Sequence, residues 1–179
     1  ARQLDVLKLA LPRRGRVGVL LGPDSRLVEQ ELLRAAAERD LDIVAARVGS
    51  ADQLPTALQR VLGEGDVLLA LPDPQIYNGA TIHNVLTSAY RHRLPLVGFS
   101  PAYVKAGAML SIYSTPAQLG TQAGEIVRAV LGGRPLPAAQ GPRLFSIGLN
   151  ADVARSLGIV VVADAETRWV EQLRSEAAP

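Results

Sequence analysis

Short apolar runs alternate along this chain with segments in which apolar residues recur every three or four positions. Runs of the first kind are typical of buried strands, and segments of the second kind are typical of helices that cover a sheet. The predicted strands are residues 16–21, 43–48, 66–71, 94–99, 108–113 and 144–149. This alternation predicts an α/β fold, with a doubly wound, mainly parallel sheet of flavodoxin-like type and helices on both faces.

Start signals and apolar spacing place helices between these strands. After the first strand, one apolar stripe predicts a helix, and its members are Leu27, Val28, Leu32, Leu33 and Ala36. Ser50 and Gln53 predict a capping box, in which each side chain bonds to the other's backbone amide. Thr115 and Gln118 predict a second capping box, at the start of a helix that ends at Gly132.

Glycine inside a helix or strand is unfavourable without a packing reason, and four of the glycines inside predicted elements carry such a prediction. Gly18 and Gly98 interrupt strands, and they predict a close approach of another part of the chain. Gly120 and Gly124 lie in the middle of the helix that starts after Thr115. They predict that this helix packs closely against the sheet.

A turn-rich stretch at 135–142 is the predicted connector. Residues 1–134 are predicted to form one α/β lobe. Residues 135–179 are predicted to add the connector, an extra strand and C-terminal helices that pack on the same domain. The tail at 177–179 is expected to fray.

Composition narrows the possible partners. The net charge is only +2 and the basic side chains are scattered, so we do not expect this protein to bind nucleic acid. No apolar run approaches the ~20 residues of a membrane span, and no export signal is present in this chain, so we expect no membrane insertion. The absence of cysteine excludes disulfides, thiol catalysis and thiolate metal sites.

No catalytic constellation is present in the sequence. His83 and His92 are nine positions apart on one predicted helix and point to opposite faces, so they do not share a metal. No phosphate-binding glycine loop follows a strand. Asp73 meets one requirement of a phosphate-receiving domain, but the acidic pair and the lysine of that site are missing. We therefore expect no enzyme activity, no cofactor and no metal.

Polar and aromatic side chains gather where the predicted strands end, which is the edge at which wound sheets bind ligands. The candidate ligand-binding residues are Asp24, Ser25, Asp73, Tyr77, Ser100, Tyr103 and Ser114. Hydrogen-bonding groups beside aromatic rings suit a small molecule. Asp24, Asp73 and Ser100 are also natural helix caps, and both roles can hold together because a helix start also attracts anionic groups.

Several motifs in the same order resemble the ABC transporter substrate-binding family. They are Leu-Pro-Asp at 71–73, the strand at 94–100, Tyr-Val-Lys-Ala-Gly-Ala at 103–108, and the segments 119–125 and 150–159. The resemblance implies the second lobe of a class I periplasmic binding protein, a two-lobed clamshell that traps a small solute, in some members an aromatic amino acid. It implies a periplasmic location and delivery to an ABC permease. By position, it implies that Asp73 and the loop around Ser100 face the cleft.

The family's first lobe would precede Arg2 and is absent from this chain. The chain is then either a fragment or a half that pairs with itself or with another envelope protein. We expect the strand at 144–149 to pair at a sheet edge or to form a homodimer. Two functions stay open: a solute-binding component of an uptake or sensing system, with an amino acid as one candidate solute, and a degenerate half-lobe that acts as a protein interaction or regulatory module without solute binding.

Overall fold

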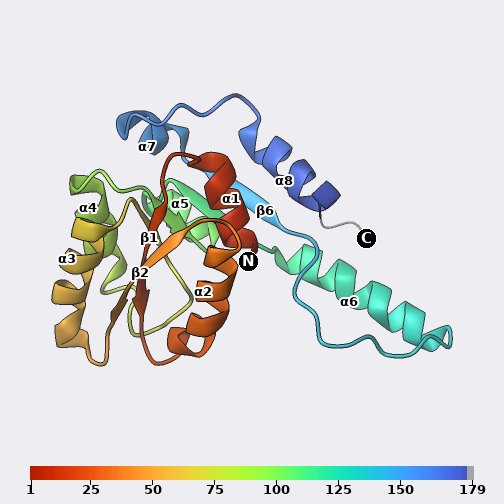
Figure 1. Ribbon diagram of the computed structural model, residues 1–179. Helices are drawn as coiled ribbons and strands as arrows, with labels where there is room; N and C mark the ends of the chain where they lie inside the picture. Colours follow the sequence, from red (N-terminus) through yellow and green to blue (C-terminus); the bar gives the residue numbers. More distant parts are fainter. Residues whose placement is uncertain (177–179) are drawn as a thin grey trace.

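The computed structural model describes residues 1–176, and its centre is one six-stranded sheet (Figure 1). The strands are β1 (Arg16–Leu21), β2 (Asp42–Arg47), β3 (Val67–Leu69), β4 (Leu96–Gly98), β5 (Leu110–Tyr113) and β6 (Ser146–Leu149). Their order is β2-β1-β3-β4-β5-β6. The first five are parallel and β6 runs antiparallel to β5. The predicted doubly wound, mainly parallel sheet is therefore confirmed, and the predicted fraying at 177–179 lies outside the described residues.

Helices follow the strands in the predicted alternation. They are α1 (Arg2–Ala10), α2 (Glu29–Ala37), α3 (Leu54–Glu64), α4 (Ile82–Arg91), α5 (Pro101–Ala106), α6 (Pro116–Leu131), α7 (Ala151–Ser156) and α8 (Ala165–Glu176). Two short 3₁₀ helices, η1 (Ser25–Val28) and η2 (Ala51–Gln53), precede α2 and α3. Helices cover both faces of the sheet, as predicted (Figure 1).

The sheet separates two apolar cores. Alternate residues of a strand point to opposite faces, so Val19 and Leu21 pack with α1 and α2 while Leu20 packs with α3 and α4. Side chains of α7 and α8 join the first core, and Tyr103 of α5 packs against the second. Complete burial of a leucine contributes about 1.5–3 kcal/mol, so these two layers are the main source of the lobe's stability.

The edge strand β6 pairs within the same sheet. Ile147 lies opposite Ile112 on β5, so the predicted edge pairing is found inside the chain. On its other side, the backbone amide of Leu149 donates to the Glu166 carboxylate of α8 at 3.1 Å. A homodimer through this strand stays a prediction.

The predicted stripe after β1 is wrong in part. Leu32 and Ala36 are buried, but Leu27 is 86% exposed and Leu33 is 46% exposed. The segment begins as the 3₁₀ turn η1, and α2 starts only at Glu29. A 3₁₀ turn has three residues per turn instead of 3.6, so it changes the phase of the stripe and leaves Leu27 in solvent.

One of the two predicted capping boxes forms. At α6, the Thr115 amide donates to Gln118 Oε1 at 2.8 Å, and the Gln118 amide donates to Thr115 Oγ1 at 3.2 Å. The prediction of a capping box at Ser50 and Gln53 is wrong, because Gln53 Oε1 accepts instead from the Gly49 amide at 2.9 Å. There the 3₁₀ turn η2 precedes the helix, so Gln53 lies before the first α-helical residue instead of inside the first turn.

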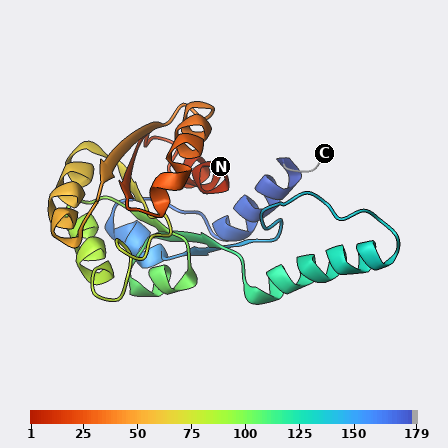
Figure 2. The ribbon, with the colours of Figure 1, turned by 90° about the horizontal axis from the view of Figure 1, so that it is seen from below.

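The strand glycines are packed as predicted, and the helix glycines are not. A Cβ on Gly18 would lie 2.3 Å from Val61 Cγ1, and a Cβ on Gly98 would lie 2.7 Å from Ser111 Oγ. Nothing lies within 4 Å of a Cβ on Gly120 or Gly124. The predicted packing of α6 on the sheet is therefore wrong, and the reason is visible in Figure 2, where α6 extends away from the body of the domain.

We predict that Gly98→Ala destabilises the lobe by about 1–3 kcal/mol, because the added methyl group overpacks the contact between β4, Ser111 and Tyr103. Urea unfolding measures the change. The matched control is Gly63→Ala in α3, where a Cβ meets nothing within 4 Å. That substitution should stabilise the helix by up to about 1 kcal/mol, and equal effects of the two substitutions would contradict the packing argument.

Candidate functional site

The loops after β1, β3, β4 and β5 lie together at the carboxyl ends of the strands, because the four strands are parallel. We call the surface formed by these loops the rim, and its residues are 22–28, 72–77, 99–103 and 114–115. All seven candidate ligand-binding residues of the sequence analysis lie on it or directly beside it. The loops that carry Asp73 and Ser100 follow the neighbouring strands β3 and β4.

A buried carboxylate joins two of the rim loops. Asp73 is 2% exposed. Its Oδ2 accepts from the Asp24 amide at 3.2 Å, from the Ser25 amide at 3.0 Å and from the Ser25 hydroxyl at 2.9 Å. Its Oδ1 accepts from the Gln75 amide at 3.1 Å. The side chain of Asp73 therefore fixes the loop after β1 against the loop after β3.

Gly22 makes this arrangement sterically possible. A Cβ at that position would lie 2.4 Å from Asp73 Oδ2, well inside van der Waals contact. The Gly22 amide also donates to the Ser25 hydroxyl oxygen at 2.8 Å. Ser25 thus accepts from one loop residue and donates to the carboxylate, and it is itself 2% exposed.

These hydrogen bonds also set the charge state of Asp73. Burial alone would raise the pKa of this carboxyl group. The amide and hydroxyl of Ser25 and the amides of Gln75 and Asp24 all donate to its ionised form and outweigh burial. The pKa of Asp73 lies below its ordinary value, so the group is a carboxylate at neutral pH.

Three aromatic rings pack together beside the carboxylate. The Phe99 and Tyr103 ring centroids are 4.6 Å apart, and Tyr77 meets them edge-on at 6.2 and 6.3 Å. Tyr77 is buried, while Phe99 and Tyr103 are half-buried. Phe99 is not among the predicted site residues, because the sequence pattern places it at the end of a strand. Its position directly before Ser100 was the available signal.

Two hydroxyl groups under this aromatic cluster are buried without a hydrogen-bond partner within residues 1–176: Tyr77 Oη and Ser111 Oγ. Burial, and then the proximity of Tyr103 and Asp73, raise the pKa of Tyr77. Burial raises the pKa of Tyr103 as well. Both phenols are therefore neutral hydrogen-bonding groups at physiological pH.

The remaining predicted site residues fall into two groups, those whose side chains cap no helix and one whose side chain is hydrogen-bonded within the chain. Asp24 is exposed and Ser100 is half-buried, and neither side chain caps the helix that follows it in the described structure. Their side chains are therefore free to contact a ligand. The Ser114 hydroxyl instead donates to the Leu144 carbonyl at 2.7 Å, so it ties the start of α6 to the segment that returns from it.

The described residues 1–176 contain no group of three or more histidine, aspartate or glutamate side chains that could hold a metal ion. Over the same residues, none of the helices combines the length and the apolar character needed to cross a bilayer. The rim presents hydrogen-bonding and aromatic groups.

A family model described as ABC transporter substrate binding protein matches residues 1–163. The chain belongs to this family. The predicted resemblance is thereby confirmed, and the rim of this substrate-binding family member follows the lobe's four neighbouring parallel strands. None of the curated proteins matches the sequence.

Solved structures agree with the family. A conserved domain protein from Vibrio cholerae shares 25% identity at a TM-score of 0.70, over 93% of this chain and 57% of that one. An open, ligand-free substrate-binding protein with adhesive properties from Clostridium difficile shares 19% identity at a TM-score of 0.74, over 92% of this chain and 57% of that one. An ABC domain from Streptococcus pneumoniae in complex with L-Trp shares 20% identity at a TM-score of 0.69, over 92% of this chain and 59% of that one. This substrate-binding family member thus spans less than three fifths of the length of these similar chains.

We predict that Asp73→Asn destabilises the lobe by about 1–3 kcal/mol, because one amide oxygen replaces two acceptors that serve four donors. The pH dependence should also change. The pKa of Asp73 is lower in the folded than in the unfolded chain, so its contribution is present above about pH 4 and is lost as pH falls through the folded pKa.

Urea unfolding between pH 7 and pH 2 measures both effects. The variant should lose less stability on acidification than the unmodified chain, while the Arg16–Asp66 pair contributes equally to both proteins. Asp42→Asn, at an exposed position at the start of β2, is the matched control and should change stability by less than about 0.5 kcal/mol. Identical pH profiles for the unmodified chain and Asp73→Asn would contradict this account of the carboxylate.

Proposed function

We propose that the rim binds a small solute through non-covalent contacts, as the ligand-binding lobe of an uptake or sensing component. The observation that carries this proposal is the pairing of free polar side chains with a half-exposed aromatic cluster, held on loops that a buried carboxylate fixes in place. Small-molecule sites combine apolar surface with a few placed polar groups in this way. The family supports the same reading, because it is one of non-catalytic substrate-binding proteins.

An amino acid is the solute class that the side chains fit best. The exposed Asp24 carboxylate suits an ammonium group, and the Ser100 hydroxyl can donate to a carboxylate. Tyr103, packed on Phe99, offers a ring against which an apolar or aromatic side chain can lie. The similar Streptococcus pneumoniae domain was solved with L-Trp bound, which supports this class.

We assign the other predicted residues to positioning. Asp73 and Ser25 are buried and bonded to each other, so they hold Asp24 where a solute reaches it. Tyr77 supports the Tyr103 ring from below through an edge contact. Ser114 fixes the base of α6 by its bond to the Leu144 carbonyl.

The partner and the location follow from the family as further proposals. A substrate-binding protein of this kind passes its solute to an ABC permease, so we propose a permease or another envelope protein as the partner. We propose the periplasm as the compartment. The cysteine-free sequence is compatible with an oxidising environment.

We predict that at least one of the common amino acids binds and raises the melting temperature, because a ligand selective for the native state stabilises it by about 2.7 kcal/mol at a hundredfold excess over Kd. Nuclear magnetic resonance titration should show shifts confined to residues 22–28, 72–77 and 99–103. Asp24→Asn and Tyr103→Ala should each weaken binding by about tenfold or more, through the lost charge-assisted bond and the lost ring contact.

Matched controls lie at the other end of the sheet. Asp42→Asn removes an exposed carboxylate at the first residue of β2, and Tyr90→Ala removes a half-exposed ring near the end of α4. Neither should change affinity. If no amino acid perturbs the rim, the proposal fails, and a protein interaction or regulatory module without solute binding becomes the better account.

A further inference from the structure

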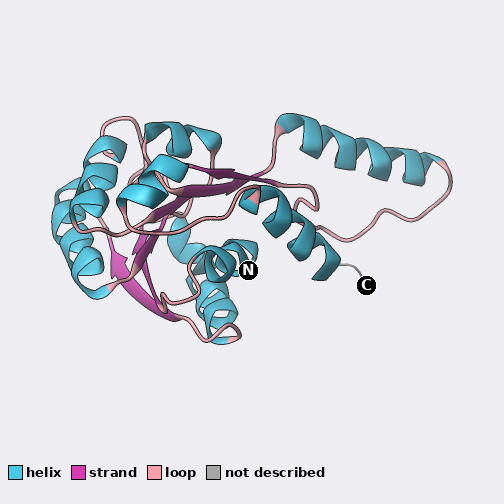
Figure 3. Ribbon diagram, turned by 90° about the horizontal axis from the view of Figure 1, so that it is seen from above, coloured by secondary structure: helices cyan, strands magenta, loops and turns pink. Residues whose placement is uncertain are grey.

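Helix α6 and residues 132–145, which we call the return segment, form an arm that stands apart from the sheet (Figures 2 and 3). A buried side chain of the helix, Gln122, holds the two parts of the arm together. It accepts from the Arg143 amide at 2.7 Å and donates to the Gly141 carbonyl at 3.2 Å. These two bonds fix the position of the return segment beside α6.

A glycine turn fixes the tip of the arm, where the chain leaves α6. Gly133 has a φ of +86°, in the left-handed region that glycine favours. The Arg134 amide donates to the Ala129 carbonyl at 3.0 Å, and the Gly133 amide donates to the Val130 carbonyl at 3.0 Å. This pair of bonds is a common way to end a helix. The backbone of Arg134 is therefore tied to the last turn of α6.

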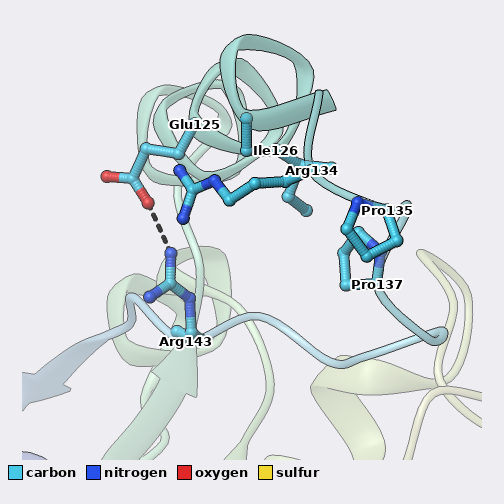
Figure 4. A pocket seen from close by; sticks show the side chains of 7 residues that line it. Glu125, Ile126, Arg134, Pro135, Pro137 and Arg143 are labelled. Carbon is cyan, nitrogen blue, oxygen red and sulfur yellow. Dashed lines mark hydrogen bonds and ion pairs between the residues drawn. The ribbon is translucent and has the colours of Figure 1, made fainter. Parts of the chain in front are cut away.

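An open groove of about 410 Å³ lies between α6 and the return segment, and Figure 4 shows the side chains that line it. Two of its apolar residues come from the helix and two are prolines of the return segment: Ile126, Ala129, Pro135 and Pro137. A proline ring fixes φ, so the proline wall of the groove is stiff. The groove thus has an apolar lining on both sides.

Three charged side chains also line this groove: Glu125, Arg134 and Arg143. Arg143 forms an ion pair with Glu125. The Arg134 guanidinium points toward both of them in Figure 4, yet its side chain makes no hydrogen bond or ion pair within residues 1–176. Two guanidinium groups therefore meet one carboxylate, which leaves one positive charge in excess in the groove.

This charge balance and the apolar lining select a class of ligand. A guanidinium group carries five N–H donors in a planar fork that matches a carboxylate, and those of Arg134 are unused. A monocarboxylate neutralises the single excess charge, whereas a dianionic phosphate would add negative charge beside Glu125. A hydrocarbon chain on the carboxylate would cover the apolar lining.

We propose that the groove between α6 and the return segment is a binding site, separate from the rim, for a small organic monocarboxylate that carries a hydrocarbon chain. The carboxylate lies between Arg134 and Arg143, and the chain lies against Ile126 and the two prolines. The site uses no residue of the rim, so this inference is independent of whether the rim binds a solute.

Hexanoate is the probe, titrated into the 179-residue chain and followed by nuclear magnetic resonance. Shifts should be confined to residues 122–143 and absent from the rim. Arg134→Gln should weaken binding about fivefold, the effect of losing an exposed ion pair. The matched control is Arg128→Gln, which removes the same charge from α6 outside the groove and should change affinity by less than about twofold.

Arg134 has no partner in the described chain, so its substitution should leave the circular dichroism spectrum unchanged. Hexylammonium and hexanol keep the hydrocarbon chain without the carboxylate, and neither should shift the groove residues. Inorganic phosphate should bind more weakly than hexanoate. Glu125→Gln raises the excess charge in the groove to two, so this variant should bind both hexanoate and phosphate more tightly than the unmodified chain.

Three results would overturn the proposal. The first is a hexanoate titration that leaves residues 122–143 unshifted or shifts the rim instead. The second is an equal loss of affinity in Arg134→Gln and Arg128→Gln, which would mean that only the total charge of the arm matters. The third is binding of hexylammonium or phosphate as tight as that of hexanoate, which would contradict the ligand class.

Discussion

The Asp73 carboxylate is the interaction on which the rim depends. A buried charge is unfavourable unless it is fully bonded, and Asp73 is bonded on both oxygens by groups from its own loop and from the loop after β1. The loop after β1 contains only the short 3₁₀ turn η1, and the loop after β3 belongs to no helix or strand. The carboxylate thus gives fixed geometry to two segments that are 48 residues apart in the chain, and the position of Asp24 follows from it.

The rest of the rim relies on close packing of small residues. Gly98, Ser111 and Gly148 lie side by side on β4, β5 and β6. A Cβ on Gly98 would lie 2.7 Å from Tyr103 Cβ, so the missing side chain there lets Tyr103 of α5 approach the sheet. Tyr103 in turn contacts Phe99 and Tyr77. Hydrogen bonds therefore fix one half of the rim and steric fit fixes the other half. A binding surface built in this way is preorganised, which lowers the entropic cost of holding a ligand.

Helix α6, unlike the rim, is specified by local signals and makes few tertiary contacts. Local signals determine α6 completely: its capping box, the proline in its first turn and its apolar spacing all specify a helix, and the structure contains that helix. Its tertiary placement does not follow from those signals. Apart from the side that meets the return segment, the helix contacts little of the described chain. Local signals therefore specify the helix, but little tertiary packing covers the rest of its surface.

The sequence by itself determined the order of strands and helices, the mainly parallel sheet, the edge of the sheet that carries the polar residues, and the family. Those features depend on hydrophobic periodicity, caps and short motifs, which are local properties of the chain. Only the tertiary structure decided that Asp73 and Ser25 bond to each other while Asp24 stays free, that Phe99 joins the aromatic cluster, and that Gly120 and Gly124 face open space. Each of these depends on contacts between residues distant in sequence or on the direction in which an element leaves the sheet, and neither is encoded in the spacing of residues along the chain.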